Sequence, residues 1–175
     1  RLDRPPGGPA AVDVVLVGAG LVLVGDDDVR GVGVGVVAGD GFFEQDPAGF
    51  KSRVGQYLSL ADKHHILTIF VFFDDCWNKV PQAGRQPEPK TGVHNSGWVQ
   101  DPGDPAYKDT SLFPALEKYV KDILTTFGKD TRILLWDLYN EPGNSGKGKT
   151  TLPLLKKVFQ WAREAGPDQP LSAGL

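Results

Sequence analysis

The stretch from Ile133 to Pro142 reads ILLWDLYNEP, and it decides the fold expected for this chain. Its first part is largely aliphatic and aromatic, which is typical of a strand buried on both faces. Asn140 and Glu141 follow at the end of the strand, and Pro142 ends it because proline cannot donate to a strand ladder. Since the functional side chains of parallel α/β folds gather at the carboxyl ends of the strands, Glu141 is expected at the mouth of a crevice.

Strands and helices alternate around this stretch. Apolar residues at helical spacing predict helices over residues 46–64, 112–127 and 150–166. Continuous apolar runs predict strands over residues 66–73 and from residue 170 onward. This alternation predicts right-handed parallel β-α-β units, as in a barrel or a doubly wound sheet. The segment from residue 74 to 110 is rich in proline and glycine and is expected to be a long functional loop.

The Asn-Glu-Pro sequence at residues 140–142 resembles the end of the fourth strand in the (β/α)8-barrel glycoside hydrolases, the cellulase-like family 5 group and its clan relatives. The resemblance extends over about residues 42–175 and includes FFDDCWN at 72–78 and VHNSGWVQ at 93–100, as in bacterial cellulase- or xylanase-type enzymes. It implies an α/β fold, namely a partial (β/α)8 TIM barrel of about strands 2 to 5. A complete barrel needs about 250 residues, so this chain of 175 residues is expected to be a fragment.

The resemblance also implies a function, the hydrolysis of O-glycosidic bonds in a β-linked polysaccharide or oligosaccharide with retention of configuration. That reaction uses two carboxylates about 5 Å apart, and Glu141 corresponds to the general acid/base. The nucleophile, a Glu at the end of the seventh strand, is expected beyond Leu175. Residues 31–36 also lack the Arg that family members carry on the second strand. The parent protein is therefore expected to be an enzyme, and this chain alone is expected to be inactive.

Polar side chains beside Glu141 are candidates for substrate binding. Asn140 would donate a hydrogen bond to the sugar 2-hydroxyl, an interaction that strengthens in the transition state. Asp74 and Asp75 end the preceding strand, where one of them could bind sugar hydroxyls or tune Glu141 by charge repulsion. Either aspartate could instead cap a helix or form hydrogen bonds within a loop.

Aromatic and histidine side chains of the same region are further candidates. The flat faces of Trp77, Trp98 and Tyr139 suit the C–H faces of pyranose rings, although a lone tryptophan is more often a core residue. His94 could also bind substrate. The three histidines of the chain do not have the spacing of metal ligands, so no metal site is predicted.

Two functions of a different class remain open. Residues 143–150 read GNSGKGKT, match the P-loop pattern and lie between a strand and a helix, which indicates a nucleotide-binding module centred on Lys149 and Thr150. Against it, Asn-Glu-Pro separates the strand from the loop, and no apolar strand that ends in Asp follows to hold magnesium. The other alternative is a non-catalytic carbohydrate-binding remnant that retains the tryptophans.

Charge and composition narrow the choice of partners. A net charge of −3 and a pI near 5.6 give no electrostatic reason to expect nucleic acid or an anionic membrane, whereas a neutral carbohydrate fits. No cofactor is implied. The apolar run at residues 14–24 is too short to span a bilayer and lacks the basic flank of a signal peptide. An extracellular or periplasmic location is implied by the resemblance alone, and the glycan and the oligomeric state stay open.

Residues 1–41 differ in composition from the rest of the chain. Between residues 10 and 41 the sequence contains Ala, Val, Asp, Leu, Gly and Arg and no other residue type. The segment could hold two buried parallel strands, Val12–Val17 and Val32–Ala38. Alternatively, it could be read in a wrong frame from a GC-rich gene, because all these residue types have G- or C-rich codons. The sequence therefore divides into a low-complexity segment, 1–41, and the hydrolase-like segment, 42–175.

Overall fold

The computed structural model describes residues 13–17, 20–24, 32–36, 40–75, 88, 90–93, 96 and 99–174. In chain order these residues form the elements β1 (Asp13–Val17), β2 (Gly20–Val24), β3 (Val32–Val36), α1 (Asp40–Gln45), α2 (Pro47–Lys63), β4 (Leu67–Val71), α3 (Asp104–Lys108), the 3-10 helix η1 (Thr110–Leu112), α4 (Phe113–Phe127), β5 (Ile133–Asn140), the 3-10 helix η2 (Gly148–Thr151), α5 (Leu152–Ala165) and β6 (Leu171–Gly174).

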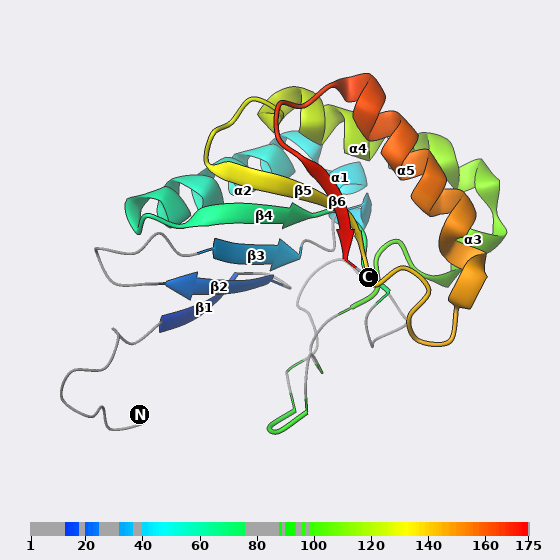
Figure 1. The fold of residues 1–175 in the computed structure, drawn as a ribbon, viewed down its shortest axis with the longest axis horizontal. Coiled ribbons are helices and arrows are strands. Elements are labelled where there is room, and N and C mark those ends of the chain that lie inside the picture. Colours follow the sequence, from blue (N-terminus) through cyan, green and yellow to red (C-terminus); the bar gives the residue numbers. More distant parts are fainter. Residues whose placement is uncertain are drawn as a thin grey trace.

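The strands form one sheet, in which they lie in chain order from β1 to β6. β1 pairs with β2, and β2 with β3, in antiparallel orientation. The three following pairings, β3 with β4, β4 with β5 and β5 with β6, are parallel. The carboxyl ends of β4, β5 and β6 therefore lie at the same edge of the sheet, and α2, α4 and α5 cover one of its sides (Figure 1).

The predicted partial (β/α)8 barrel is wrong. A barrel segment consists of parallel strands, whereas the described strands form a small open sheet that begins with two antiparallel pairings. The difference arises in the low-complexity segment, for which the sequence predicts two parallel strands. A further strand, β2, forms between them and pairs with β1 from Asp13↔Val24 to Val17↔Gly20. The strands β1 and β3, which fall within the two predicted ranges, are therefore separated by a strand of opposite direction.

The helices and strands predicted from residue 46 onward are confirmed, apart from small differences at their ends. The Asp46 carboxylate accepts a hydrogen bond from the Gly49 N–H at 2.8 Å, which caps α2 at the position that the sequence indicates. The same helix buries Phe50, Val54 and Leu58, which share one face. Within the predicted long loop, residues 104–112 form the short helices α3 and η1.

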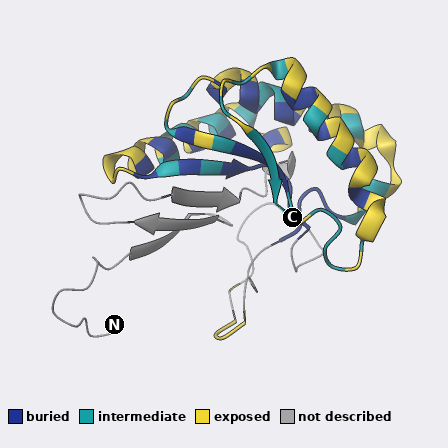
Figure 2. Cartoon of the chain, in the orientation of Figure 1, coloured by how far each residue is buried: buried dark blue, intermediate teal, exposed yellow. Residues whose placement is uncertain are grey.

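The core lies between the sheet and the helices, and aromatic rings fill much of it. The Trp136 ring centroid lies 5.3 Å from that of Phe70 and 5.6 Å from that of Phe72, and Phe72 in turn contacts Tyr119 of α4 at 5.4 Å. Figure 2 shows buried residues on β4 and β5 and on the inner sides of the helices, and exposed residues on the outer sides. The indole N–H of Trp136 donates to Gln169 Oε1 at 2.9 Å, so this buried polar group is satisfied.

Among the described residues, the helices are all too short or too polar to cross a bilayer.

Two leucines of β5 test this packing, because Leu138 is fully buried and Leu134 is 39% exposed. Leu138→Ala removes side-chain contacts and leaves a cavity, so the free energy of unfolding is expected to fall by about 2–5 kcal/mol. Leu134→Ala is the matched control, for which the change should stay within about 0.5 kcal/mol. Urea denaturation of both variants measures the difference, and equal losses would contradict the described orientation of β5.

Candidate functional site

Glu141 follows directly after β5 and occupies a distinct backbone position. Its φ angle is 47°, in the left-handed region that residues with a side chain rarely adopt. The Glu141 N–H donates to the carbonyl of Gly174 at the end of β6, at 2.8 Å, so the neighbouring strand fixes this geometry. The side chain itself is exposed, and its Oε2 accepts a hydrogen bond from Asn144 Nδ2 at 2.5 Å. The predicted acid/base is thus a solvent-facing carboxylate on a fixed backbone.

Asn140, the last residue of β5, is held beside Glu141 by the segment that follows β4. Its Nδ2 donates to Asp74 Oδ2 at 3.0 Å, and its backbone N–H donates to the carbonyl of Phe73 at 2.8 Å. Asp74 is fully buried and orients the amide, which is the loop hydrogen-bonding role that the sequence leaves open for it. An amide nitrogen carries two protons, so Asn140 can donate the second one to a ligand.

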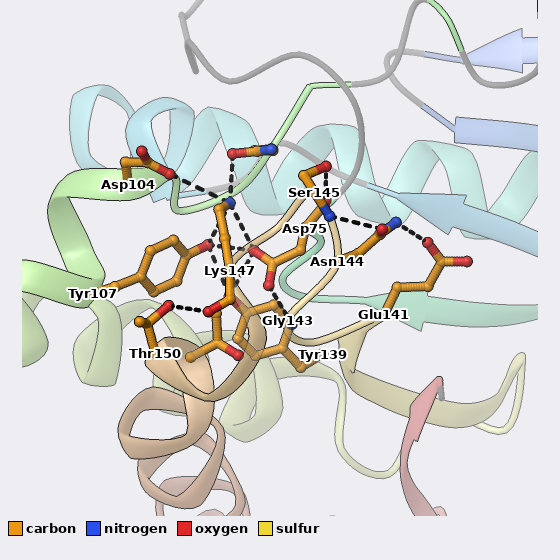
Figure 3. A network of polar contacts seen from close by, with 12 residues as sticks. Asp75, Asp104, Tyr107, Tyr139, Glu141, Gly143, Asn144, Ser145, Lys147 and Thr150 are labelled. Atoms are coloured by element: carbon orange, nitrogen blue, oxygen red, sulfur yellow. Dashed lines mark hydrogen bonds and ion pairs between the residues drawn. The ribbon is translucent and has the colours of Figure 1, made fainter.

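Asp75 is the centre of a buried polar network that joins distant segments (Figure 3). Its carboxylate accepts hydrogen bonds from the Tyr107 hydroxyl at 2.5 Å, from the Gly143 N–H at 2.7 Å and from Lys147 Nζ at 2.9 Å. The Asp75 side chain is fully buried and that of Lys147 is 7% exposed. Removing either partner of such an ion pair would leave an uncompensated charge in the interior, which is strongly destabilising.

Two tyrosines complete this network. The Tyr139 hydroxyl lies 2.8 Å from that of Tyr107 and 3.1 Å from Asp75 Oδ1. Burial, together with the neighbouring Asp75 carboxylate, raises the pKa of both phenols far above the ordinary value, so both hydroxyls stay protonated and able to donate. Tyr139 is fully buried against Phe73, with ring centroids 5.9 Å apart. This position favours a core role over the sugar contact that the sequence predicts.

The segment 143–150 matches the P-loop pattern in sequence, but most of its backbone N–H groups donate to acceptors within the chain. In a P-loop, backbone N–H groups cradle phosphate oxygens. Here the N–H groups of Gly143, Asn144, Ser145, Lys147, Gly148 and Thr150 all donate to acceptors within the chain. Lys149 and Thr150, on which nucleotide binding would depend, are exposed. These donors are therefore already engaged and do not form an anion cradle.

Three predicted substrate-binding residues, Trp77, His94 and Trp98, lie outside the described residues, and their roles stay predictions. The described site also contains residues that the sequence did not indicate. Lys147 falls within the P-loop match at a position to which that pattern gives no role, and Tyr107 lies in a segment without periodicity. Both reach Asp75 through contacts that are distant in sequence, which a local pattern does not record.

In comparisons with known proteins, no protein-family model matches this chain, and no curated protein matches it significantly.

Asp137, on β5, is a buried carboxyl near the same edge of the sheet. Burial raises its pKa above the ordinary 3.8, although the N–H groups of Tyr139 and Gly174 donate to it. A raised pKa in the folded state means that the folded chain holds the proton more tightly, so this contribution to stability is present at low pH and is lost as pH rises through the folded pKa.

Asp137→Asn is expected to remove this loss of stability at higher pH, because an amide does not ionise. The amide oxygen can still accept the N–H groups of Tyr139 and Gly174. The melting temperature of the variant relative to the unmodified chain should therefore increase as pH rises above 3.8. Each gain of about 1 kcal/mol in the free energy of unfolding would raise the melting temperature by roughly 2–4 °C. Calorimetry across this pH range measures the difference, with the exposed Asp168→Asn as control. A difference in melting temperature between the variant and the unmodified chain that is the same at every pH would contradict the expectation.

Nucleotide binding can be tested separately. Because the N–H groups of segment 143–150 are engaged within the chain, equilibrium dialysis with labelled ATP and magnesium should give no retention that depends on Lys149. Retention that Lys149→Ala abolishes would contradict this and support the P-loop alternative.

Proposed function

We propose that Glu141 is the general acid/base of a β-glycoside hydrolase that acts with retention of configuration, and that Asn140 donates a hydrogen bond to the substrate beside it. The observation that carries the proposal is the exposed Glu141 carboxylate held at φ 47° at the carboxyl end of β5. A non-glycine residue in this region costs about 1–3 kcal/mol and is typical of functional positions. The resemblance of Asn-Glu-Pro to the hydrolases supports the same role.

The chemistry requires a carboxylic acid that protonates the leaving oxygen as the glycosidic bond breaks. Glu141 is accessible to a ligand, whereas Asp74 and Asp75 are fully buried and serve as acceptors for Asn140 and the polar network. A retaining mechanism also needs a second carboxylate about 5 Å away, and we assign none among the described residues. The proposed substrate is a β-linked polysaccharide or oligosaccharide. Trp77, Trp98 and His94 remain proposed contacts to it.

An affinity label tests this role without requiring the second carboxylate. The full chain is incubated with an epoxyalkyl β-cellobioside and with the matching β-xylobioside. A glycan site would place the epoxide beside Glu141, whose carboxylate oxygen attacks the terminal epoxide carbon. The carbon–oxygen bond of the ring then breaks, the released oxygen takes a proton from solvent, and Glu141 carries an ester. Peptide mass spectrometry is expected to find this adduct on Glu141, with a rate that saturates with label and falls when free disaccharide competes.

Glu141→Gln should abolish the adduct, because an amide is a poor nucleophile. Glu44→Gln is the matched control, since Glu44 is also exposed but lies on α1, and it should leave labelling unchanged. Labelling that does not saturate, or that is spread over exposed carboxylates without preference for Glu141, would overturn the proposal. Saturable disaccharide binding without a Glu141 adduct would also overturn the acid/base role and favour a carbohydrate-binding function.

A further inference from the structure

We propose that Lys147 is a positioning residue for Glu141, and that it acts by anchoring the segment 143–148, here called the support loop, on the buried Asp75. The inference rests on the proposed function of Glu141. The proposal is based on a continuous series of contacts. These lead from Asp75 through Lys147 and the support loop to Asn144, and from Asn144 to the Glu141 carboxylate.

Lys147 is held from several sides. Its Nζ donates to Asp75 Oδ1 at 2.9 Å and to Gln100 Oε1, and it lies 3.7 Å from the Asp104 carboxylate. The same ammonium lies 4.6 Å from the centre of the Tyr107 ring, a favourable cation–π distance. A lysine that is 7% exposed and bound by fixed acceptors has little rotamer freedom left. It therefore fixes the backbone of the support loop at its own position.

Asp75 binds the support loop at three alternate residues. The Gly143 N–H donates to Asp75 Oδ2, the Ser145 hydroxyl donates to the Asp75 carbonyl at 3.0 Å, and Lys147 pairs with Oδ1. Asn144 lies between the first two anchors. Figure 3 shows Asp75 on the inner side of the loop and Glu141 beyond Asn144 on the other side.

The backbone of the support loop is constrained by an internal hydrogen bond and by several positive φ angles, so its residues cannot shift independently. The Gly148 N–H donates to the carbonyl of Gly143 at 2.8 Å, and φ is positive at Gly143, Ser145, Gly146 and Gly148. A Cβ at Gly143 would lie 2.6 Å from the Gly148 carbonyl oxygen, so this close approach requires glycine. The backbone from 143 to 148 therefore behaves as one unit, whose position depends on its anchors.

Asn144 transmits this position to Glu141. Its Oδ1 accepts the Ser145 N–H at 2.7 Å, which orients the amide so that Nδ2 donates to Glu141 Oε2 at 2.5 Å. The Asn144 N–H also donates to the Glu141 carbonyl at 3.0 Å. An exposed glutamate side chain otherwise samples several rotamers, so this one hydrogen bond selects the orientation in which the carboxylate is presented.

Two readouts test the proposal, and the first does not depend on any glycoside chemistry. In the ¹⁵N-labelled full chain, the Asn144 side-chain amide is identified by its disappearance in Asn144→Ala. Lys147→Met should move this signal to the position of a free amide and speed its proton exchange. Lys149→Met, an exposed lysine two residues away, is the matched control and should leave it unchanged. A folded Lys147→Met chain with an unchanged Asn144 amide would overturn the proposal.

The second readout is the rate at which the epoxyalkyl glycoside labels Glu141. Lys147→Met and Asn144→Ala should each lower it about fivefold, the effect of one hydrogen bond of about 1 kcal/mol. Because both act through the same contact, the double variant should fall no further than either single one. If the labelling rate of the double variant instead fell by the product of the two single-variant factors, the two residues would act independently, and the proposal would be overturned. If the unmodified chain is not labelled at all, the proposed function fails, while the amide signal still tests the anchor.

Lys147→Met is expected to destabilise the chain, because it removes the ion-pair partner of the buried Asp75. Ser145→Gly is therefore measured in parallel, since it removes only the hydroxyl anchor and relieves the left-handed φ of 53°. It should shift the Asn144 amide in the same direction by a smaller amount and slow labelling. An unchanged amide and an unchanged labelling rate in the folded Ser145→Gly chain would overturn the proposal by themselves.

Discussion

The buried carboxylate of Asp75 is the constraint on which the arrangement of this edge of the sheet depends. A charge in the interior is tolerated when it is paired and its oxygens accept hydrogen bonds. Asp75 meets both conditions through Tyr107 of α3 and through Lys147 and the Gly143 backbone of the support loop. Bringing these donors to one carboxylate fixes the segment after β4 against α3 and against the loop that follows β5.

The sequence predicts well the elements that depend on local patterns. The Asp46 cap, the apolar face of α2 and the strand that ends at Asn140 are all found, because each follows from residue spacing within one element. The strand β2 was not predicted, because a short apolar run such as Gly20–Val24 does not by itself indicate a separate strand or its direction. The Asp75–Lys147 pair was missed because its partners lie 72 residues apart in sequence.

The glycine-rich segment after β5 shows how one pattern can serve two kinds of structure. Glycines in a P-loop let the backbone approach a phosphate, whereas Gly143 here lets the backbone approach itself at Gly148. Both arrangements require positive φ angles and short contacts, so the spacing of glycines does not distinguish them. What distinguishes them is the acceptors of the backbone N–H groups, which here are Asp75, the Glu141 carbonyl and the loop itself.

The left-handed backbone at Glu141 also has a consequence for how this position can vary among related sequences. Glycine, asparagine and aspartate adopt this region at the lowest cost. A lineage in which the carboxylate lost its use would be expected to drift toward those residues, since each would relieve strain without disturbing the bond between the residue 141 N–H and Gly174. Retention of glutamate at this position would then mark the lineages in which the side chain is still selected.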